Sequence, residues 1–263
     1  MHIGTIIPKD FAELDAQRDW WKDKEFINDL YSILPNIRFM DVSGGEPTLN
    51  KSFLDILDHC INQDFAKNIH LEITTNGQQI NPKLMEKLNQ FKKVNVLISI
   101  DGYKDTYEYI RYKGSWNKLK KNIKFLQHNS SENVSLICHM TAQVLNILDL
   151  PKLLEWLEKN NIDWNTIDIV TRPHYHNIQI LPKDVKSVAI KNFEEFIKKH
   201  HLDVHKQLLI SNIIKALRSN NQEYESKWWP YFVKDTKIKD DIRKQSIEKS
   251  IPKLYNMIKE RFK

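Results

Sequence analysis

Five short apolar segments alternate with helical patterns through the middle of this chain, and that alternation constrains its fold more than any other feature. The segments that we predict to be strands span residues 37–42, 69–75, 94–100, 134–141 and 164–171. Helical patterns lie between consecutive strands, at residues 52–63, 82–91, 105–112, 116–127 and 150–160. Strands and helices that alternate at this spacing are typical of βαβ units, so the sequence predicts an α/β fold with a parallel sheet.

The flanking segments are helical in pattern and divide the chain into three predicted parts. An N-terminal helical segment covers residues 1–36, with its helix at 9–33, and the α/β part covers residues 37–182. A helical C-terminal region covers residues 183–263, with helices expected at 184–200, 204–220 and 239–263. Before the last of these, Trp228, Trp229, Tyr231 and Phe232 form an aromatic cluster. We interpret these rings as packing the helical region onto the α/β part.

The composition argues against several classes of protein. Lysine and arginine outnumber aspartate and glutamate by only 40 to 34, and basic residues such as Lys118, Lys120 and Lys121 surround an apolar helical stripe, so nucleic-acid binding is not indicated. No apolar run is long enough to span a membrane, and the first residues show no secretory signal pattern. Two cysteines provide no disulfide framework, which favours a reducing, cytoplasmic setting.

Polar side chains share one face of four successive predicted strands, toward the carboxyl end of each. The pairs are Asp41 and Ser43, Thr74 and Asn76, Ser99 and Asp101, and His139 and Thr141. A parallel sheet covered by helices on both faces is normally apolar on both. The pattern therefore predicts a curved sheet with helices outside and a polar lumen that opens at the carboxyl edge, as in barrel-like α/β folds.

Glycines gather at the same edge. Of the six in the chain, Gly44, Gly45, Gly77 and Gly102 stand just beyond predicted strands. Glycine permits positive φ and lets the backbone approach a ligand closely, so their positions indicate a ligand-binding edge.

Three successive motifs together resemble those of a known family. Gly44-Gly45-Glu46-Pro47 follows the first predicted strand, Thr75-Asn76-Gly77 ends the second, and Ser99-Ile100-Asp101-Gly102 ends the third, with Arg111 and Gly114 beyond it. Together they resemble the radical S-adenosylmethionine (SAM) enzymes, most closely members with a twitch- or SPASM-type extension. The resemblance covers residues 38–182 and implies a partial (βα)6 TIM-like barrel that lacks its first strand, with the first barrel helix in residues 1–36.

The resemblance also implies a chemistry. Enzymes of this family hold a [4Fe–4S] cluster whose open iron chelates SAM, and reductive cleavage of SAM gives a 5′-deoxyadenosyl radical that abstracts hydrogen from a substrate. A peptide or small-metabolite substrate is implied, together with a reductant such as a flavodoxin or ferredoxin. The alternative is a non-catalytic α/β binding or scaffold protein derived from a radical SAM domain.

Carried onto this sequence, the resemblance places a SAM site at the strand ends. Gly44, Gly45 and Glu46 would bind the SAM ammonium, which needs hydrogen-bond acceptors. Asn76 and Ser99 would face the ribose or the methionine carboxylate. The whole expected set is Gly44, Gly45, Glu46, Pro47, Thr75, Asn76, Gly77, Ser99, Asp101 and Arg111.

Two members of that set have alternatives. Arg111 either pairs with the SAM carboxylate through its planar fork or forms an ion pair on a helix surface. Asp101 either belongs to the site or only shapes the turn before Gly102. The sequence indicates no catalytic residue. His174 and His176 could present a metal pair, but without a third ligand nearby no metal site is predicted.

The cluster motif of the family, CxxxCxxC, is absent from this sequence. Cys60 and Cys138 are far apart, and we interpret both as small buried hydrophobic residues. One explanation, which we favour, is that Met1 is not the natural start and that a first strand with its cluster loop has been lost. The other is a degenerate relative that keeps the shape of the SAM site. In either case the chain by itself is not expected to assemble the cluster.

Overall fold

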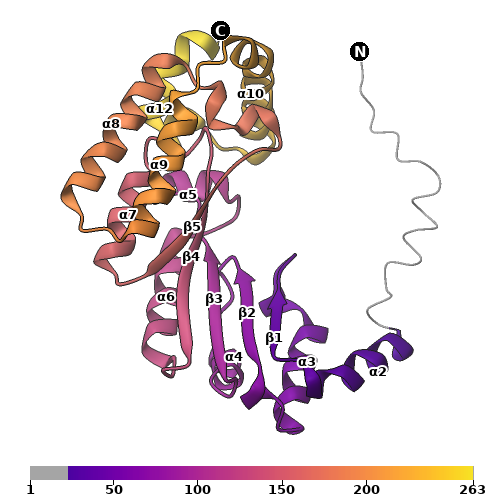
Figure 1. Cartoon of the computed structure of the whole chain (residues 1–263). Coiled ribbons are helices and arrows are strands. Elements are labelled where there is room, and N and C mark those ends of the chain that lie inside the picture. Colours follow the sequence, from indigo (N-terminus) through magenta and orange to yellow (C-terminus); the bar gives the residue numbers. More distant parts are fainter. Residues whose placement is uncertain (1–22, 263) are drawn as a thin grey trace, which may run out of the picture.

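The structure is a computed structural model that describes residues 23–262. Five strands form one sheet in chain order, and all neighbouring strands are parallel (Figure 1). They are β1 (Phe39–Val42), β2 (His70–Thr75), β3 (Lys93–Ser99), β4 (Val134–Ala142) and β5 (Asp163–Ile169). The parallel sheet and the helices that follow it confirm the predicted α/β partial barrel with a helical C-terminal region.

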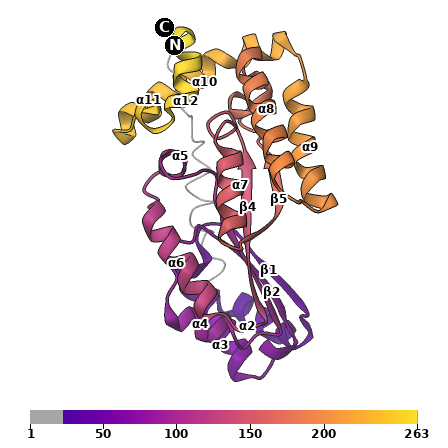
Figure 2. The same ribbon diagram turned by 90° about the vertical axis from the view of Figure 1, so that its left-hand side faces the viewer.

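Helices connect the strands and cover one face of the sheet. These are α3 (Lys51–Asn62), α4 (Pro82–Leu88), α5 (Asp105–Ile110), α6 (Trp116–Asn129) and α7 (Leu150–Lys159). Figure 2 shows α3, α4 and α6 together on one side of the strands. Several of these helices begin at a side-chain cap: Asn50 accepts from the N–H of Phe53, and Asn81 accepts from that of Leu84. The helices lie close to the ranges predicted from the sequence, because the capping residues and the apolar periodicity indicate the same helix boundaries.

The two faces of the sheet differ in the way the strand pattern predicts. In β3 the side chains of Val94, Val96 and Ile98 are buried beneath the helices, whereas Asn95 and Ser99 on the other face are half-exposed. In β2, likewise, Ile73 is buried and Thr74 is half-exposed. The predicted polar lumen is therefore a concave face whose polar side chains reach solvent.

The C-terminal helices pack beyond β5 and over the carboxyl ends of β4 and β5 (Figure 1). They are α8 (Lys183–Lys199), α9 (Val204–Arg218), α10 (Gln222–Arg243), α11 (Ile247–Ser250) and α12 (Pro252–Ile258). Helix α9 lies against β5, where Lys206 Nζ contacts Asp163 at 3.2 Å and His205 Nε2 contacts the Asn165 carbonyl at 2.8 Å. This contact places α9 beside the edge strand of the sheet.

Two predictions for this region are wrong. The aromatic cluster lies inside α10, although Pro230 falls within that helix, and residues 239–263 do not form one helix. The break occurs because Lys244 adopts a left-handed conformation with φ 54° and ends α10, after which the Ser246 side chain caps α11. The packing role of the aromatic cluster agrees with the structure, since Phe232 is fully buried against His176 and the Trp228 and His174 rings lie 4.9 Å apart.

The first described helix is α2 (Lys24–Ile33), whose cap Asp23 accepts from the N–H of Glu25 at 2.7 Å. The rest of the helix expected at 9–33 lies outside the described residues. The division into three domains at residues 36 and 182 stays a prediction. Within residues 23–262, no helix is both long and apolar enough to cross a lipid bilayer.

Candidate functional site

Glu46 joins the loop after β1 to the end of β2. Its Oε1 accepts from the Thr48 hydroxyl at 2.6 Å and the Thr75 hydroxyl at 2.5 Å, and its Oε2 accepts from the Asn76 N–H at 2.9 Å. Glu46 also precedes the 3-10 turn Pro47–Leu49, in which Pro47 is buried. A carboxylate has about four acceptor positions, so Oε2 retains room for a further donor while its orientation is fixed.

Gly44 and Gly45 are the two glycines at this edge that face open space. Their φ values are 96° and 55°, and a Cβ on either would meet nothing within 4 Å. At Gly77, with φ 69°, a Cβ would lie 2.8 Å from Leu119 Cδ1 and 3.1 Å from Ile98 Cγ2. Packing therefore accounts for Gly77, whereas Gly44 and Gly45 leave exposed backbone that a ligand can approach.

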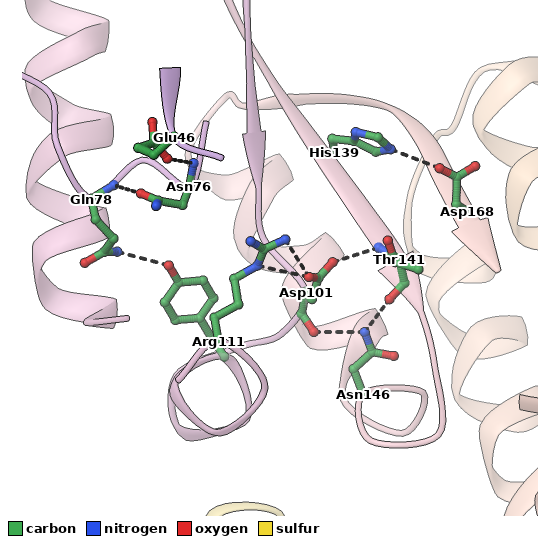
Figure 3. Close-up of polar contacts among 10 residues, drawn as sticks. Glu46, Asn76, Gln78, Asp101, Arg111, His139, Thr141, Asn146 and Asp168 are labelled. Atoms are coloured by element: carbon green, nitrogen blue, oxygen red, sulfur yellow. Dashed lines mark hydrogen bonds and ion pairs between the residues drawn. The ribbon is translucent and has the colours of Figure 1, made fainter. Parts of the chain in front are cut away.

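The loop after β2 is held by its own side chains, as Figure 3 shows. Asn76 Oδ1 accepts from the Gln78 N–H at 2.8 Å, and Gln78 Nε2 donates to the Tyr107 hydroxyl at 3.0 Å. Gln78 Oε1 in turn accepts from the Ser115 N–H at 3.1 Å. The amide nitrogen of Asn76 makes no hydrogen bond within the described chain. Sequence reasoning missed Gln78 and Thr48, because neither belongs to a motif and only the contacts show their roles.

Asp101 and Arg111 pair with each other at the end of β3 (Figure 3). Asp101 Oδ2 lies 2.7 Å from Arg111 Nη2 and 3.0 Å from Nε, and Oδ1 accepts from the Thr141 N–H at 2.9 Å. The buried Asn146 donates to the Asp101 carbonyl at 2.8 Å. Asp101 therefore does more than shape a turn, and the guanidinium of Arg111 is directed at an internal carboxylate. Asn146 was also missed, since a buried asparagine gives no signal in the sequence.

Across the sheet, His139 and Asp168 form a polar pair on the concave face. His139 Nε2 lies 3.0 Å from Asp168 Oδ2, joining β4 to β5 (Figure 3). Ser99 stands directly beside His139 in the strand register, and its hydroxyl makes no hydrogen bond within the described chain. The expected residues of β1 to β3 thus share one edge, with further polar side chains beside them.

The cysteines do not fit an iron–sulfur cluster. Cys60 and Cys138 are both fully buried, in α3 and β4 respectively. Burial raises the pKa of Cys60 to about 11 and raises that of Cys138 well above its ordinary value. Among residues 23–262, no three His, Cys, Asp or Glu side chains are grouped as metal ligands. The described residues therefore provide no set of three cysteine ligands for the cluster that the resemblance implies.

The sheet, its open carboxyl edge and the three strand-end motifs define a radical SAM-type domain. The model of the radical SAM superfamily matches residues 17–157, which is more than half of the sequence. This chain belongs to the radical SAM superfamily.

Two curated relatives match at moderate identity. One is the mycofactocin maturase MftC of Mycolicibacterium smegmatis (strain ATCC 700084 / mc(2)155), 26% identical over 142 residues, which are 54% of this chain and 34% of that protein. The other is the Fe-coproporphyrin III synthase of Methanosarcina barkeri (strain Fusaro / DSM 804), 27% identical over 151 residues, which are 57% of this chain and 36% of that protein. The matched part is about a third of the length of each relative.

A solved structure described as native anSMEcpe with bound AdoMet has a similar fold. It superimposes with a TM-score of 0.50 and 15% sequence identity, over 69% of this chain and 54% of that one. At this identity the likeness supports the fold alone.

Proposed function

We propose that this chain binds SAM at the carboxyl ends of β1 to β3, as the SAM-binding part of a radical SAM enzyme. The observation that carries the proposal is the edge formed by Gly44, Gly45 and Glu46. It combines backbone open to solvent with a carboxylate held by Thr48, Thr75 and the Asn76 N–H. A fixed carboxylate with a free acceptor position beside exposed peptide carbonyls suits an ammonium group, which has three donors and no acceptor.

The residues present fit SAM. Glu46 and the backbone of Gly44 and Gly45 would hold the methionine ammonium, and Asn76 and Ser99 would contact the ribose or the carboxylate. Arg111 would act mainly through Asp101, by fixing the end of β3 against β4. When bound with a reduced [4Fe–4S] cluster, SAM supplies the radical chemistry of the family. In a form that also carries the cluster cysteines, the substrate would be a peptide or small metabolite, and the reductant a flavodoxin- or ferredoxin-like protein.

The proposal can be tested by comparing two ligands on two variants. SAM carries the methionine ammonium and 5′-methylthioadenosine does not, so Glu46→Gln should weaken SAM binding selectively. Charge-assisted hydrogen bonds contribute about 1.5–3 kcal/mol, which corresponds to a loss of about tenfold or more in affinity for SAM. Equilibrium dialysis measures both ligands.

Glu72→Gln is the matched control. Glu72 lies on the concave face of β2 below the strand end, where it accepts from Asn95 at 2.9 Å. Its substitution should leave SAM affinity unchanged. If Glu46→Gln weakened SAM and 5′-methylthioadenosine equally, or if the native chain bound neither, the proposed site would be wrong.

One observation favours a second function, a SAM-binding protein without radical chemistry. Both cysteines are buried, one in α3 and one in β4, and residues 23–262 hold no group of metal ligands, so the described chain combines the proposed SAM site with no ligands for the cluster. The DNA upstream of Met1 distinguishes the two functions. An in-frame CxxxCxxC there supports the enzyme, and a stop codon closely preceding Met1 supports the binding protein.

A further inference from the structure

A pocket of about 210 Å³ lies between the carboxyl ends of β4 and β5 and the helix α10. Gln143 and Arg172 line it from beyond the two strands, Tyr109 lines it from α5, and Asp235, Lys239 and Arg243 line it from α10. It opens at the same edge of the sheet as the candidate SAM site, two strands further along. None of the residues expected to bind SAM lines it.

Two arginines of this pocket have no carboxylate partner. Among the arginines of residues 23–262, Arg111, Arg218 and Arg261 form ion pairs, and Arg38 binds backbone carbonyls. The remaining two are Arg172 and Arg243, and both line this pocket. Arg172 is exposed, and Arg243 is half-buried with its guanidinium 5.2 Å from the centre of the Tyr112 ring. The described chain thus places its two unpaired guanidinium groups around one cavity.

The acids nearby are already occupied. Asp235 Oδ2 contacts Lys239 Nζ at 2.6 Å and His176 Nε2 at 3.0 Å. Asp240 accepts from the Tyr109 hydroxyl at 2.7 Å and from the Ile247 N–H at 3.0 Å. Neither acid lies within ion-pair distance of Arg172 or Arg243, so the positive charge of the pocket is free for an anion. Planar guanidinium groups suit carboxylates especially well.

His176 adds a second requirement on the ligand. Its side chain is only 8% exposed and lines the pocket, and its buried Nδ1 has no hydrogen-bond partner in the described chain. Nε2 lies 3.0 Å from Asp235 Oδ2 and 3.2 Å from Lys239 Nζ, and Lys239 donates to the same Asp235 oxygen at 2.6 Å. We assign the proton to Nε2, because its shorter contact is with a carboxylate oxygen, which only accepts. Nδ1 is then a buried acceptor, and leaving such an atom unsatisfied is unfavourable. Nδ1 has almost no solvent exposure, so a ligand N–H or O–H would satisfy it after a small shift of the neighbouring side chains.

We propose that this pocket binds a carboxylate that carries a neighbouring N–H or O–H donor, as in an N-acylated amino acid unit or a hydroxy acid. Arg172 and Arg243 hold the carboxylate, and His176 Nδ1 accepts from the donor beside it. That this group belongs to the substrate rests on the proposed function, whereas the binding itself does not.

The test uses small probes and chain labelled with 15N at histidine. N-Acetylglycine and glycolate each carry a carboxylate with a neighbouring donor, acetate lacks the donor, and N-acetylglycinamide lacks the carboxylate. We expect saturable shifts of the His176 ring signals with N-acetylglycine or glycolate, and the stronger of the two identifies the donor as N–H or O–H. Acetate and N-acetylglycinamide should bind about tenfold more weakly, because each lacks at least one of the hydrogen bonds that the full probe makes.

Arg243→Gln should weaken the better probe about tenfold or more. Arg218→Gln, at an exposed arginine paired with Glu194, is the matched control and should leave binding within about twofold. Shifts that do not saturate, or an equal effect of the two substitutions, would overturn the proposal. A separate titration with SAM distinguishes the two proposals. If the chain binds the probe but not SAM, the proposal for this pocket stands and the proposed function is wrong.

Discussion

Asp101 binds Arg111 and the backbone of Thr141 with separate carboxylate oxygens. Oδ2 pairs with the Arg111 guanidinium, whose Nη2 lies 2.7 Å away, and Oδ1 accepts a hydrogen bond from the Thr141 N–H at 2.9 Å. One side chain therefore fastens the end of β3 to β4 and to the end of α5. The side chain of Asp101 is 10% exposed and that of Arg111 is 31% exposed, so the pair is shielded from solvent more than a surface ion pair.

Asp101→Asn should destabilise the chain by about 2 kcal/mol, because it leaves the partly buried guanidinium without its counter-charge. Urea unfolding measures the change. Glu194→Gln breaks the exposed pair with Arg218 and should cost about 0.5 kcal/mol or less. Equal costs for the two substitutions would mean that Asp101 and Arg111 do not depend on each other in the fold.

Comparing Gly45→Ala with Gly77→Ala should distinguish a glycine that lets a ligand reach the backbone from one that is needed for packing. At Gly77 a Cβ would collide with Leu119 and Ile98 and φ is positive, so we expect a loss of about 2–4 kcal/mol in unfolding free energy. At Gly45 space is open and only the positive φ is unfavourable, so we expect about 1–2 kcal/mol.

SAM affinity provides the second measurement for this pair. Gly45→Ala should reduce it in chain that is still folded at the assay temperature, because the new methyl group occupies the approach to the backbone. An unchanged affinity in Gly45→Ala would remove this glycine from the site.

Features that depend on residues close together in the sequence could be predicted, and features that depend on distant residues could not. The strands and most helices could be predicted because caps such as Asn50 and the period-two burial of β3 are local. Glu46 could be placed just beyond the first strand for the same reason. The partner of Arg111 could not, because two uses of a guanidinium look alike in sequence and only the fold brings Asp101 to it.

The C-terminal region shows where local rules fail. A proline inside a helix normally breaks it, yet α10 continues through Pro230. There Phe232 packs against Trp229 and Phe262, and Trp229 Nε1 donates to the Arg261 carbonyl at 3.4 Å. Tertiary packing of aromatic area outweighs the local cost of the proline here. Similarly, the pocket beside α10 depends on residues some 60 positions apart, such as His176 and Asp235, which no spacing rule connects.

The two thiols should be unreactive in the folded chain. Burial raises the pKa of Cys60 to about 11 and that of Cys138 well above its ordinary value, so little thiolate exists at neutral pH. A disulfide reagent should release no chromophore from native protein within minutes and should titrate two thiols after denaturation. Cys60→Ala and Cys138→Ala identify the residue responsible if one thiol reacts quickly, an outcome that would contradict the burial of that cysteine.

Unfolding free energy should fall as the pH is lowered below about 6.5, in part through His176. Burial lowers the pKa of His176 from its ordinary value of 6.5, and the nearby Lys239 lowers it further, against the opposing effect of Asp235. Below pH 6.5 the unfolded chain therefore binds a proton at this residue more readily than the folded chain does. Stability rises with pH wherever the unfolded state holds more protons, so acidification favours unfolding.

His176→Gln should make the pH dependence shallower between about pH 7.5 and 5.5, since glutamine does not titrate. The comparison is made on unfolding free energies from urea titrations at each pH. His201→Gln, at an exposed histidine after α8, is the control and should retain the slope of the native chain. If His176→Gln kept the full slope as well, the protonation of His176 would not be coupled to folding, and the assignment of a neutral imidazole beside Asp235 and Lys239 would have to be given up.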